Sequence, residues 1–194
     1  MTNNSIIIGI LGFQGDFLEH QQILNQLGVK TIIIKNKIDL EKIDGLIIPG
    51  GESTTIKRFI EKKNMLKPLK KFILEDKKYV MGTCAGAIIL SKKTVSKGQI
   101  VDGIIPAMDI VTERNSYGSQ INSFIKTIKL KEIGEYNCIF IRAPKILKVN
   151  HGIVFGYENN NPIMVRNENI LICTFHPELE NSDIHKYFLD NLFK

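Results

Sequence analysis

The stretch YVMGTCAGAIIL, residues 79–90, decides the fold more than any other part of this chain. Its first residues form a short apolar run of the kind that is buried in a parallel sheet. Its last residues are small and aliphatic and can form a helix. The turn between them carries glycines at positions 82 and 86, where a larger side chain would meet the neighbouring strand and helix. A strand, a sharp turn and a helix in this order predict one unit of a parallel α/β fold.

The N-terminal half repeats this alternation of strand and helix. Strands are expected over residues 6–11, 29–34 and 46–48. Helices are expected from Phe17 to Gly28, from an N-cap at Ser53 to about Glu61, and around residues 67–74. This rhythm predicts an α/β fold with a doubly wound, mostly parallel sheet and helices on both faces.

From about Ile100 onward the pattern changes to short strands separated by Gly, Asn and Pro turns. These strands are expected over residues 107–112, 124–130, 136–141, 153–157, 163–165 and 170–175. We interpret them as an antiparallel excursion added to the parallel sheet, with a closing helix over residues 183–193. No linker or repeat interrupts the chain, so residues 1–194 are expected to form a single domain.

The composition excludes several classes of function. The net charge is +6 with 26 basic residues, but the lysines are scattered and no nucleic-acid motif is present, which predicts a solvated surface and no nucleic-acid partner. No apolar run approaches the roughly 20 residues that cross a bilayer, and no secretory signal is expected. Three widely spaced cysteines without a CxxC pair favour neither disulfides nor zinc, so no metal, no cofactor and a cytoplasmic location are expected.

Cys84 is expected to be a nucleophile because it occupies the centre of the glycine-flanked turn. Such a turn lifts the sulfur above the carboxyl ends of the strands, and the helix that follows favours the reactive thiolate. The backbone N–H of Ala85 is placed to bond a developing oxyanion. The alternative is a buried structural cysteine, which the two glycines disfavour. Cys138 and Cys173 lie inside apolar runs and are expected to be core residues.

The tripeptide His176-Pro177-Glu178 follows a strand that we expect to be buried. Residues two apart in extended backbone point to the same side, so the imidazole of His176 and the carboxylate of Glu178 can pair. A base and its orienting carboxylate are what a cysteine nucleophile requires. A surface or capping role is the alternative for His176. His20, on the first helix, is expected to be a packing or hydrogen-bonding residue near the site.

The loop after residues 46–48, Pro49-Gly50-Gly51-Glu52-Ser53, is expected beside the Cys84 turn. Gly51 could supply a second oxyanion donor, and Glu52 could bind a substrate ammonium group. A phosphate loop is the rival, but its signature is absent and Glu52 would repel phosphate. Arg114 and Arg142 are candidates to bind a substrate carboxylate, although surface ion pairs explain them equally well.

Five motifs of the chain together resemble a known family, the glutaminase subunit of pyridoxal 5′-phosphate synthase. They are Gly50-Gly51-Glu52-Ser53-Thr54-Thr55, Gly82-Thr83-Cys84-Ala85-Gly86, Glu113-Arg114-Asn115-Ser116-Tyr117-Gly118, Ile141-Arg142-Ala143-Pro144 and Phe175-His176-Pro177-Glu178-Leu179. The second and the last are shared by all class I, triad-type glutamine amidotransferases, whereas the other three are specific to the subfamily. The segment 16–18 departs from the family pattern, close to the face that meets the partner in the family.

The resemblance implies hydrolysis of L-glutamine to L-glutamate and ammonia through a thioester on a catalytic cysteine. It assigns catalysis to Cys84, His176 and Glu178, glutamine binding to Gly51, Glu52, Ser53, Arg114, Ile141 and Arg142, and the oxyanion hole to Gly51 and Ala85. The implied partner is a (β/α)8-barrel synthase subunit, which uses the ammonia to build the vitamin B6 cofactor and activates the glutaminase on docking.

Three alternatives remain on sequence grounds. Another triad amidotransferase, for instance one serving histidine biosynthesis, would share the cysteine turn and the histidine. A cysteine hydrolase or chaperone-like protein could use the same architecture. A non-catalytic binding subunit would carry an unreactive Cys84.

Overall fold

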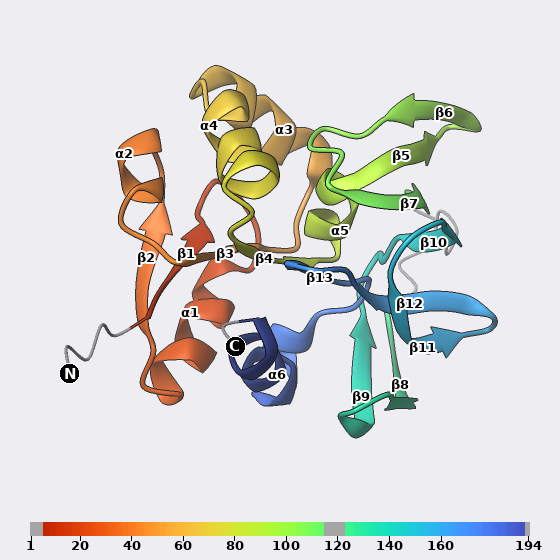
Figure 1. The fold of residues 1–194 in the computed structure, drawn as a ribbon. Helices are drawn as coiled ribbons and strands as arrows, with labels where there is room; N and C mark the ends of the chain where they lie inside the picture. The colour runs from red at the N-terminus through yellow and green to blue at the C-terminus, as the bar shows by residue number, and fades with distance from the viewer. Residues whose placement is uncertain (1–5, 115–122, 193–194) are drawn as a thin grey trace.

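The structure, a computed structural model, describes residues 6–114 and 123–192 and centres on a seven-stranded sheet (Figure 1). From one edge to the other, its strands are β11 (Ile153–Glu158), β12 (Asn161–Arg166), β13 (Ile170–Cys173), β4 (Tyr79–Thr83), β3 (Gly45–Ile48), β1 (Ile7–Leu11) and β2 (Lys30–Ile34). The strands from β13 to β2 are parallel, and β11 and β12 add an antiparallel edge. The predicted doubly wound, mostly parallel sheet is confirmed.

Helices cover both faces of this sheet, as Figure 1 shows. One face carries α1 (Phe17–Gln26) and α6 (Asp183–Leu192), and the other carries α2 (Lys37–Leu40), α3 (Ser53–Lys62), α4 (Leu66–Lys70), a π-helical turn (Lys71–Glu75) and α5 (Ala85–Leu90). None of the helices in the described part of the chain is long and apolar enough to cross a membrane.

Alternation along the central strands divides the apolar core into two layers. In β3, Leu46 and Ile48 pack with the layer that contains α3, whereas Ile47 packs with the layer that contains α1 and α6. The same period of two makes Val80 and Met81 of β4 face opposite layers. Strands buried on both faces are therefore apolar at every position, which is why the sequence shows continuous apolar runs here.

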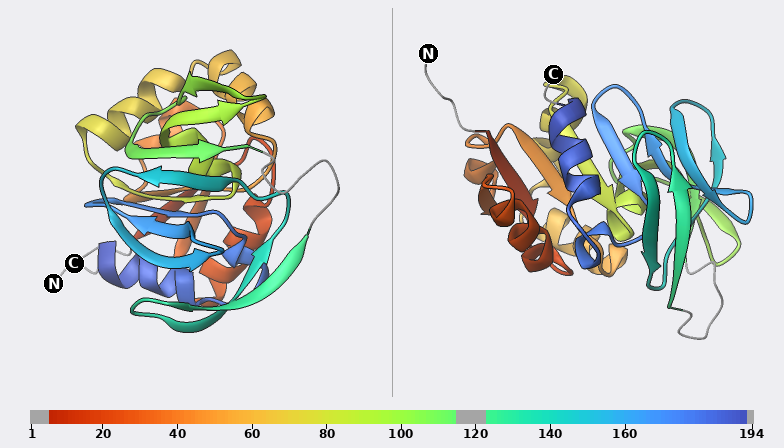
Figure 2. Two further views of the ribbon diagram at one scale, coloured as in Figure 1. Left: turned by 90° about the vertical axis from the view of Figure 1, so that its right-hand side faces the viewer. Right: turned by 90° about the horizontal axis from the view of Figure 1, so that it is seen from below.

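The second half of the chain builds two further sheets at the end of the molecule away from β2 (Figures 1 and 2). A four-stranded sheet has the order β10 (Lys145–Val149), β7 (Met108–Glu113), β5 (Ser91–Ser96) and β6 (Gln99–Asp102), and β8 (Phe124–Leu130) pairs with β9 (Gly134–Phe140). The predicted excursion is present, but of its strands only β11 and β12, which are antiparallel, and β13, which is parallel to β4, join the main sheet. Strands β5, β6 and β10 were not predicted; few of their residues are buried, so they lack the alternation of apolar and polar residues that marks a half-buried strand.

The helices differ from expectation at one N-cap and include one helix that was not predicted. Ser53 was expected to cap α3, but it is the first helical residue, and Glu52 holds the N-cap position without a side-chain cap bond. For the polar segment after β2 no helix was predicted. There Asn36 and Asp39 form a capping box that starts α2, because each side chain accepts from the other residue's backbone N–H.

The turn from β4 into α5 is held against β3 and β13. Cys84 has a left-handed φ of 47°, and its N–H donates to the carbonyl of Cys173 at 2.8 Å. A Cβ added to Gly86 would lie 2.0 Å from the carbonyl oxygen of Ile48, and one added to Gly82 would lie 2.9 Å from the Gly86 carbonyl carbon. Both glycines are therefore required by the close approach of α5 to the sheet.

We expect Gly86→Ala to destabilise the chain by about 1–3 kcal/mol, because the new methyl group would overlap backbone that cannot move freely. In an exposed helix the same change would stabilise by roughly 1 kcal/mol. Denaturant unfolding measures the sign. Lys62→Ala at the exposed end of α3 serves as a control and should stay within about 0.5 kcal/mol of wild type. A Gly86→Ala variant as stable as wild type would contradict the packing argument.

Candidate active site

A cavity of about 160 Å³ opens where the loops after β1, β3, β4 and β13 meet. Cavities of roughly 150 Å³ accept small molecules such as benzene. The predicted site residues that line it are Gly51, Glu52, Ser53, Cys84, Ala85, Arg114, Ile141, Arg142 and His176. Of the predicted set only Glu178 lies outside the lining, behind His176. The loops share one edge because the carboxyl ends of parallel strands point the same way.

Cys84 presents its sulfur to this cavity from the strained turn. Its residue is 5% exposed, and the thiol donates a long hydrogen bond to the carbonyl oxygen of Ile141 at 3.8 Å. His176 lines the same cavity, and the Cys84 thiol lies near enough to its ring to raise the pKa of His176. The structure thus brings the predicted nucleophile and the predicted base together.

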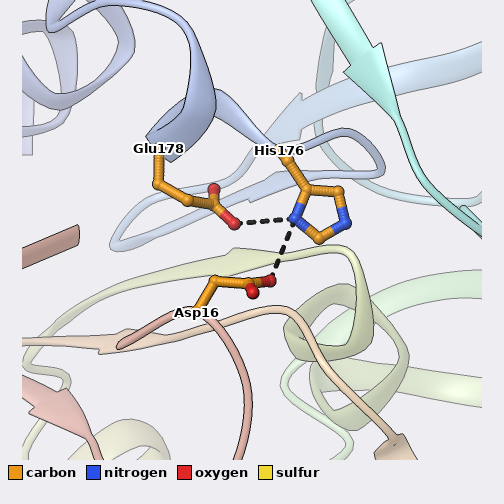
Figure 3. A group of neighbouring side chains, drawn as sticks. All are labelled: Asp16, His176 and Glu178. Atoms are coloured by element: carbon orange, nitrogen blue, oxygen red, sulfur yellow. Dashed lines mark hydrogen bonds and ion pairs between the residues drawn. The ribbon is translucent and has the colours of Figure 1, made fainter. Parts of the chain in front are cut away.

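His176 is oriented by two carboxylates, as Figure 3 shows. Its Nδ1 lies 2.7 Å from Oε1 of Glu178 and 3.3 Å from Oδ2 of Asp16. Ionised carboxylates only accept hydrogen bonds, so Nδ1 of His176 carries a proton. The other ring nitrogen, Nε2, makes no hydrogen bond and is the one left to exchange a proton with the Cys84 thiol. Burial alone would lower the pKa of His176, but its interactions with Asp16, Cys84 and Glu178 outweigh burial and raise the pKa to about 12.

Asp16, His176 and Glu178 bring three potential ligand atoms within 4.8 Å of one another. The chemistry of the cluster suits an ion pair better than a metal, because the Nδ1 lone pair of His176 is used for the N–H that both carboxylates bind. The hydrogen bond from His176 lowers the pKa of Asp16 despite the partial burial of that carboxyl group. The cluster therefore holds a positive imidazole between two negative groups.

Glu178 is 5% exposed, and burial raises the pKa of its carboxyl group against the opposing effect of His176. Its second oxygen, Oε2, lies 3.4 Å from Nε2 of His20. His20 is fully buried and also contacts His185 at 2.8 Å and the hydroxyl of Thr83 at 3.2 Å. The expectation that His20 is a hydrogen-bonding residue near the site is confirmed.

The two groups predicted to bind a zwitterion, Glu52 and Arg142, contact each other. Nη1 of Arg142 lies 2.8 Å from Oε1 of Glu52, and both side chains are about half exposed. Such a pair contributes little to stability. The N–H of Glu52 donates to Oε1 of Gln14 at 2.6 Å, which ties the glycine loop to the loop after β1. A carboxylate at this position does not suit a phosphate site.

The sequence did not indicate six residues that line the cavity or lie behind it: Gln14, Gly15, Asp16, Thr83, Ile88 and His185. Gln14 and Asp16 flank Gly15 directly after β1, and the shared edge of parallel strands could have indicated them. His185 carried no signal, because only the tertiary packing of α6 brings it to His20. Arg114 lines the cavity at the end of β7, while the motif residues 115–118 lie outside the described part of the chain.

Cys138 and Cys173, which were predicted to be core residues, are fully buried. Burial raises the pKa of the Cys138 thiol to about 12 and raises that of Cys173 well above its ordinary value. Neither thiol ionises readily, and neither lines the cavity. Their burial distinguishes them from Cys84, whose sulfur reaches the site.

Comparison with known proteins gives consistent relatives. The chain is 44% identical to the pyridoxal 5′-phosphate synthase subunit PdxT of Caldicellulosiruptor bescii over 96% of this chain and 98% of that protein. It is 43% identical to PdxT of Thermosipho africanus over 96% and 99% of the two chains. A crystal structure of a glutamine amidotransferase superposes with a TM-score of 0.88 at 34% identity, covering 96% of this chain and 99% of that one.

A more distant structure shows how widely this architecture is used. PurLQS from Thermotoga maritima superposes with a TM-score of 0.72 at 16% identity, covering 97% of this chain and 98% of that one, a level of identity that supports the fold alone. Residues 10–194 match the SNO glutamine amidotransferase family. With the fold, the cavity and relatives above 40% identity in agreement, the chain belongs to the SNO glutamine amidotransferase family.

Proposed function

We propose that this chain is a glutaminase that hydrolyses L-glutamine to L-glutamate and ammonia, with Cys84, His176 and Glu178 as its triad. The observation that supports this most strongly is the line of groups at the cavity: a cysteine on a strained turn, the imidazole of His176 beside it, and a buried carboxylate 2.7 Å behind that imidazole. Membership of an amidotransferase family agrees with this chemistry.

In the proposed reaction the Cys84 thiolate attacks the side-chain amide carbon of glutamine. The negative charge moves to the amide oxygen, where the N–H groups of Ala85 and Gly51 are the proposed donors. His176 transfers its proton to the leaving nitrogen, so ammonia departs and a thioester remains on Cys84. Water, deprotonated by His176, then attacks the thioester and releases glutamate. Glu178 keeps the imidazole in the required tautomer.

Glutamine recognition is proposed to replace the ion pair between Glu52 and Arg142. The substrate carries an ammonium group that Glu52 can accept and a carboxylate that a guanidinium binds with two parallel hydrogen bonds. Ser53, Arg114 and the backbone of Ile141 complete the proposed binding set, since all of them line the same cavity. Before glutamine binds, Glu52 and Arg142 neutralise each other.

The ammonia is proposed to pass to a pyridoxal 5′-phosphate synthase subunit, a (β/α)8 barrel. The support is the similarity to relatives that are pyridoxal 5′-phosphate synthase subunits named PdxT and that match this chain over nearly their full length. These relatives favour vitamin B6 synthesis over the histidine-pathway alternative. We further propose that residues 1–194 act as a single amidotransferase domain, in the cytoplasm, where thiols stay reduced.

The test is to mix the chain with a candidate synthase subunit and measure glutamate release and glutamine-dependent formation of pyridoxal phosphate. Cys84→Ala should abolish both, while an ammonium salt supplied to the same mixture should still support cofactor formation, because only ammonia production is lost. Cys138→Ala, which removes a buried thiol away from the cavity, should retain activity. A Cys84→Ala variant that still releases glutamate, or a wild-type mixture that releases none, would contradict the proposal.

Arg142→Gln should raise the KM for glutamine about tenfold to a hundredfold with a smaller effect on kcat, because it removes a charged hydrogen bond made before and during reaction. Steady-state glutaminase kinetics in the mixture measure both constants. Arg58→Gln, an exposed arginine of α3, is the matched control and should leave KM unchanged. A loss confined to kcat would instead place Arg142 at the reacting amide.

The stability that His176 provides should decline as the pH rises. Its pKa is raised from 6.5 to about 12 in the folded chain, so between these values the folded state holds a proton that the unfolded state has released. The contribution is complete below about pH 6.5 and is lost as the pH approaches 12. Denaturant unfolding of wild type and His176→Gln from about pH 6 to about pH 9 should therefore converge. A constant difference between them would contradict the assignment.

A further inference from the structure

We propose that His20 is a positioning residue of this glutaminase: held by His185, it presents an N–H to the inner oxygen of Glu178 and fixes the carboxylate that orients His176. This inference rests on the proposed function. It extends the line Cys84, His176 and Glu178 inward by two further side chains that do not touch the cavity.

The four elements that meet behind the triad bury these groups completely. His20 comes from α1, Thr83 from the last position of β4, and His185 from α6, and all three are 0% exposed. Glu178 comes from the short 3-10 helix Pro177–Leu179. Two histidines that are packed against each other in an apolar layer need a reason, because each buried polar nitrogen without a partner costs stability.

Charge considerations keep both of these imidazoles neutral. Burial lowers the pKa of His20 well below its ordinary value, with His185 and His176 adding to the effect, and burial lowers the pKa of His185 to about 3. A neutral imidazole has one N–H and one lone pair, so each of the two rings must choose a tautomer. The contacts around the pair determine which one.

One pair of tautomers fits the contacts best. Nε2 of His20 lies 3.4 Å from Oε2 of Glu178, which can only accept, and 3.2 Å from the Thr83 hydroxyl, which can accept too. If Nε2 carries the proton, Nδ1 is the acceptor, and Nε2 of His185 donates to it across 2.8 Å. Two atoms of this group then make no hydrogen bond: Nδ1 of His185, as a lone pair, and Oε2 of Glu178, which the N–H of His20 approaches at 3.4 Å without hydrogen-bond geometry.

The opposite arrangement is less favourable at both ends. A proton on Nδ1 of His20 would point the lone pair of its Nε2 at the negative Oε2 of Glu178. It would also place the proton of His185 on Nδ1, an N–H buried without an acceptor. Both effects raise the energy of the opposite arrangement. The carboxylate of Glu178 therefore selects the tautomer of His20 and, through it, the tautomer of His185.

The consequence for catalysis is that each oxygen of Glu178 faces an imidazole nitrogen, through a hydrogen bond at Oε1 and a longer polar contact at Oε2. Oε1 binds the N–H of His176 at 2.7 Å, and Oε2 faces His20. The titratable groups facing this carboxyl are His176 and Asp16 on the cavity side and His20 on the inner side, with the Cys173 thiol also near. Without His20, the carboxylate could turn away from His176 and would lose its neutral inner donor.

The experiment compares His20→Ala with His20→Gln in the complete mixture with the synthase subunit. His20→Ala should lower kcat for glutamine hydrolysis about tenfold to a hundredfold with KM little changed, because it misplaces the base. The acidic limb of the pH profile should move to higher pH, since loss of the donor raises the pKa of Glu178. His20→Gln, whose amide can still donate to Oε2, should recover much of both.

Two further readouts separate positioning from stability alone. The low-field proton resonance of the His176 Nδ1–H should weaken or shift in His20→Ala and return in His20→Gln. At α6, His185→Gln should preserve the donor to His20, whereas His185→Phe should remove it and reproduce part of the His20→Ala effect. His151→Gln, an exposed histidine of a turn, is the control and should change none of these quantities.

The inference would be overturned if His20→Ala kept the wild-type kcat, the wild-type acidic limb of the pH profile and the wild-type Nδ1–H resonance of His176. The glutaminase assignment would then remain intact. If His20→Ala does not fold, His20→Gln and His185→Phe decide in its place: unchanged kcat and acidic limb in His185→Phe would overturn the inference. Failure of all three to fold would assign the pair to stability and overturn it as well. A wild-type mixture that releases no glutamate would instead overturn the proposed function itself.

Discussion

The contact on which the rest of the site depends is the approach of α5 to the end of β3. Without a side chain at Gly86, the helix can lie against the carbonyl of Ile48, and the chain leaves β4 through a left-handed residue at Cys84. Strained backbone of this kind persists only where its surroundings over-determine it. Here the hydrogen bond from Cys84 to Cys173 and the packing of both glycines do so, and they fix the sulfur at the edge where four loops converge.

The charge state of His176, the imidazole beside the Cys84 sulfur, is determined by its two carboxylate neighbours. A nearly buried imidazole would ordinarily be neutral, but His176 lies between Asp16 and Glu178 and is held as a cation. The carboxylate of Asp16 remains partly open to the cavity, whereas that of Glu178 is closed off by the apolar layer and the two inner histidines.

The parallel architecture explains why these residues lie far apart in the chain and close together in space. The strand order passes from β4 and β3 to β1 and β2, so the chain reverses its winding direction beside β1 and leaves a crevice at the carboxyl ends. The loops after β1, β3, β4 and β13 all open into it. Arg114, which follows β7 of the second sheet, also lines the cavity, as does Ile88 of α5.

The sequence alone determined the parallel sheet, the cysteine turn and the pairing of His176 with Glu178, because each depends on local patterns: continuous apolar runs, glycines two positions from Cys84, and side chains two apart in extended backbone. It could not determine the contacts of Asp16, His20 or His185, since these join residues up to 165 positions apart and depend on how α1 and α6 pack on one face. The polar strands of the second sheet were missed for a related reason. Their identity depends on the neighbours they pair with, and pairing is decided only when the chain has folded.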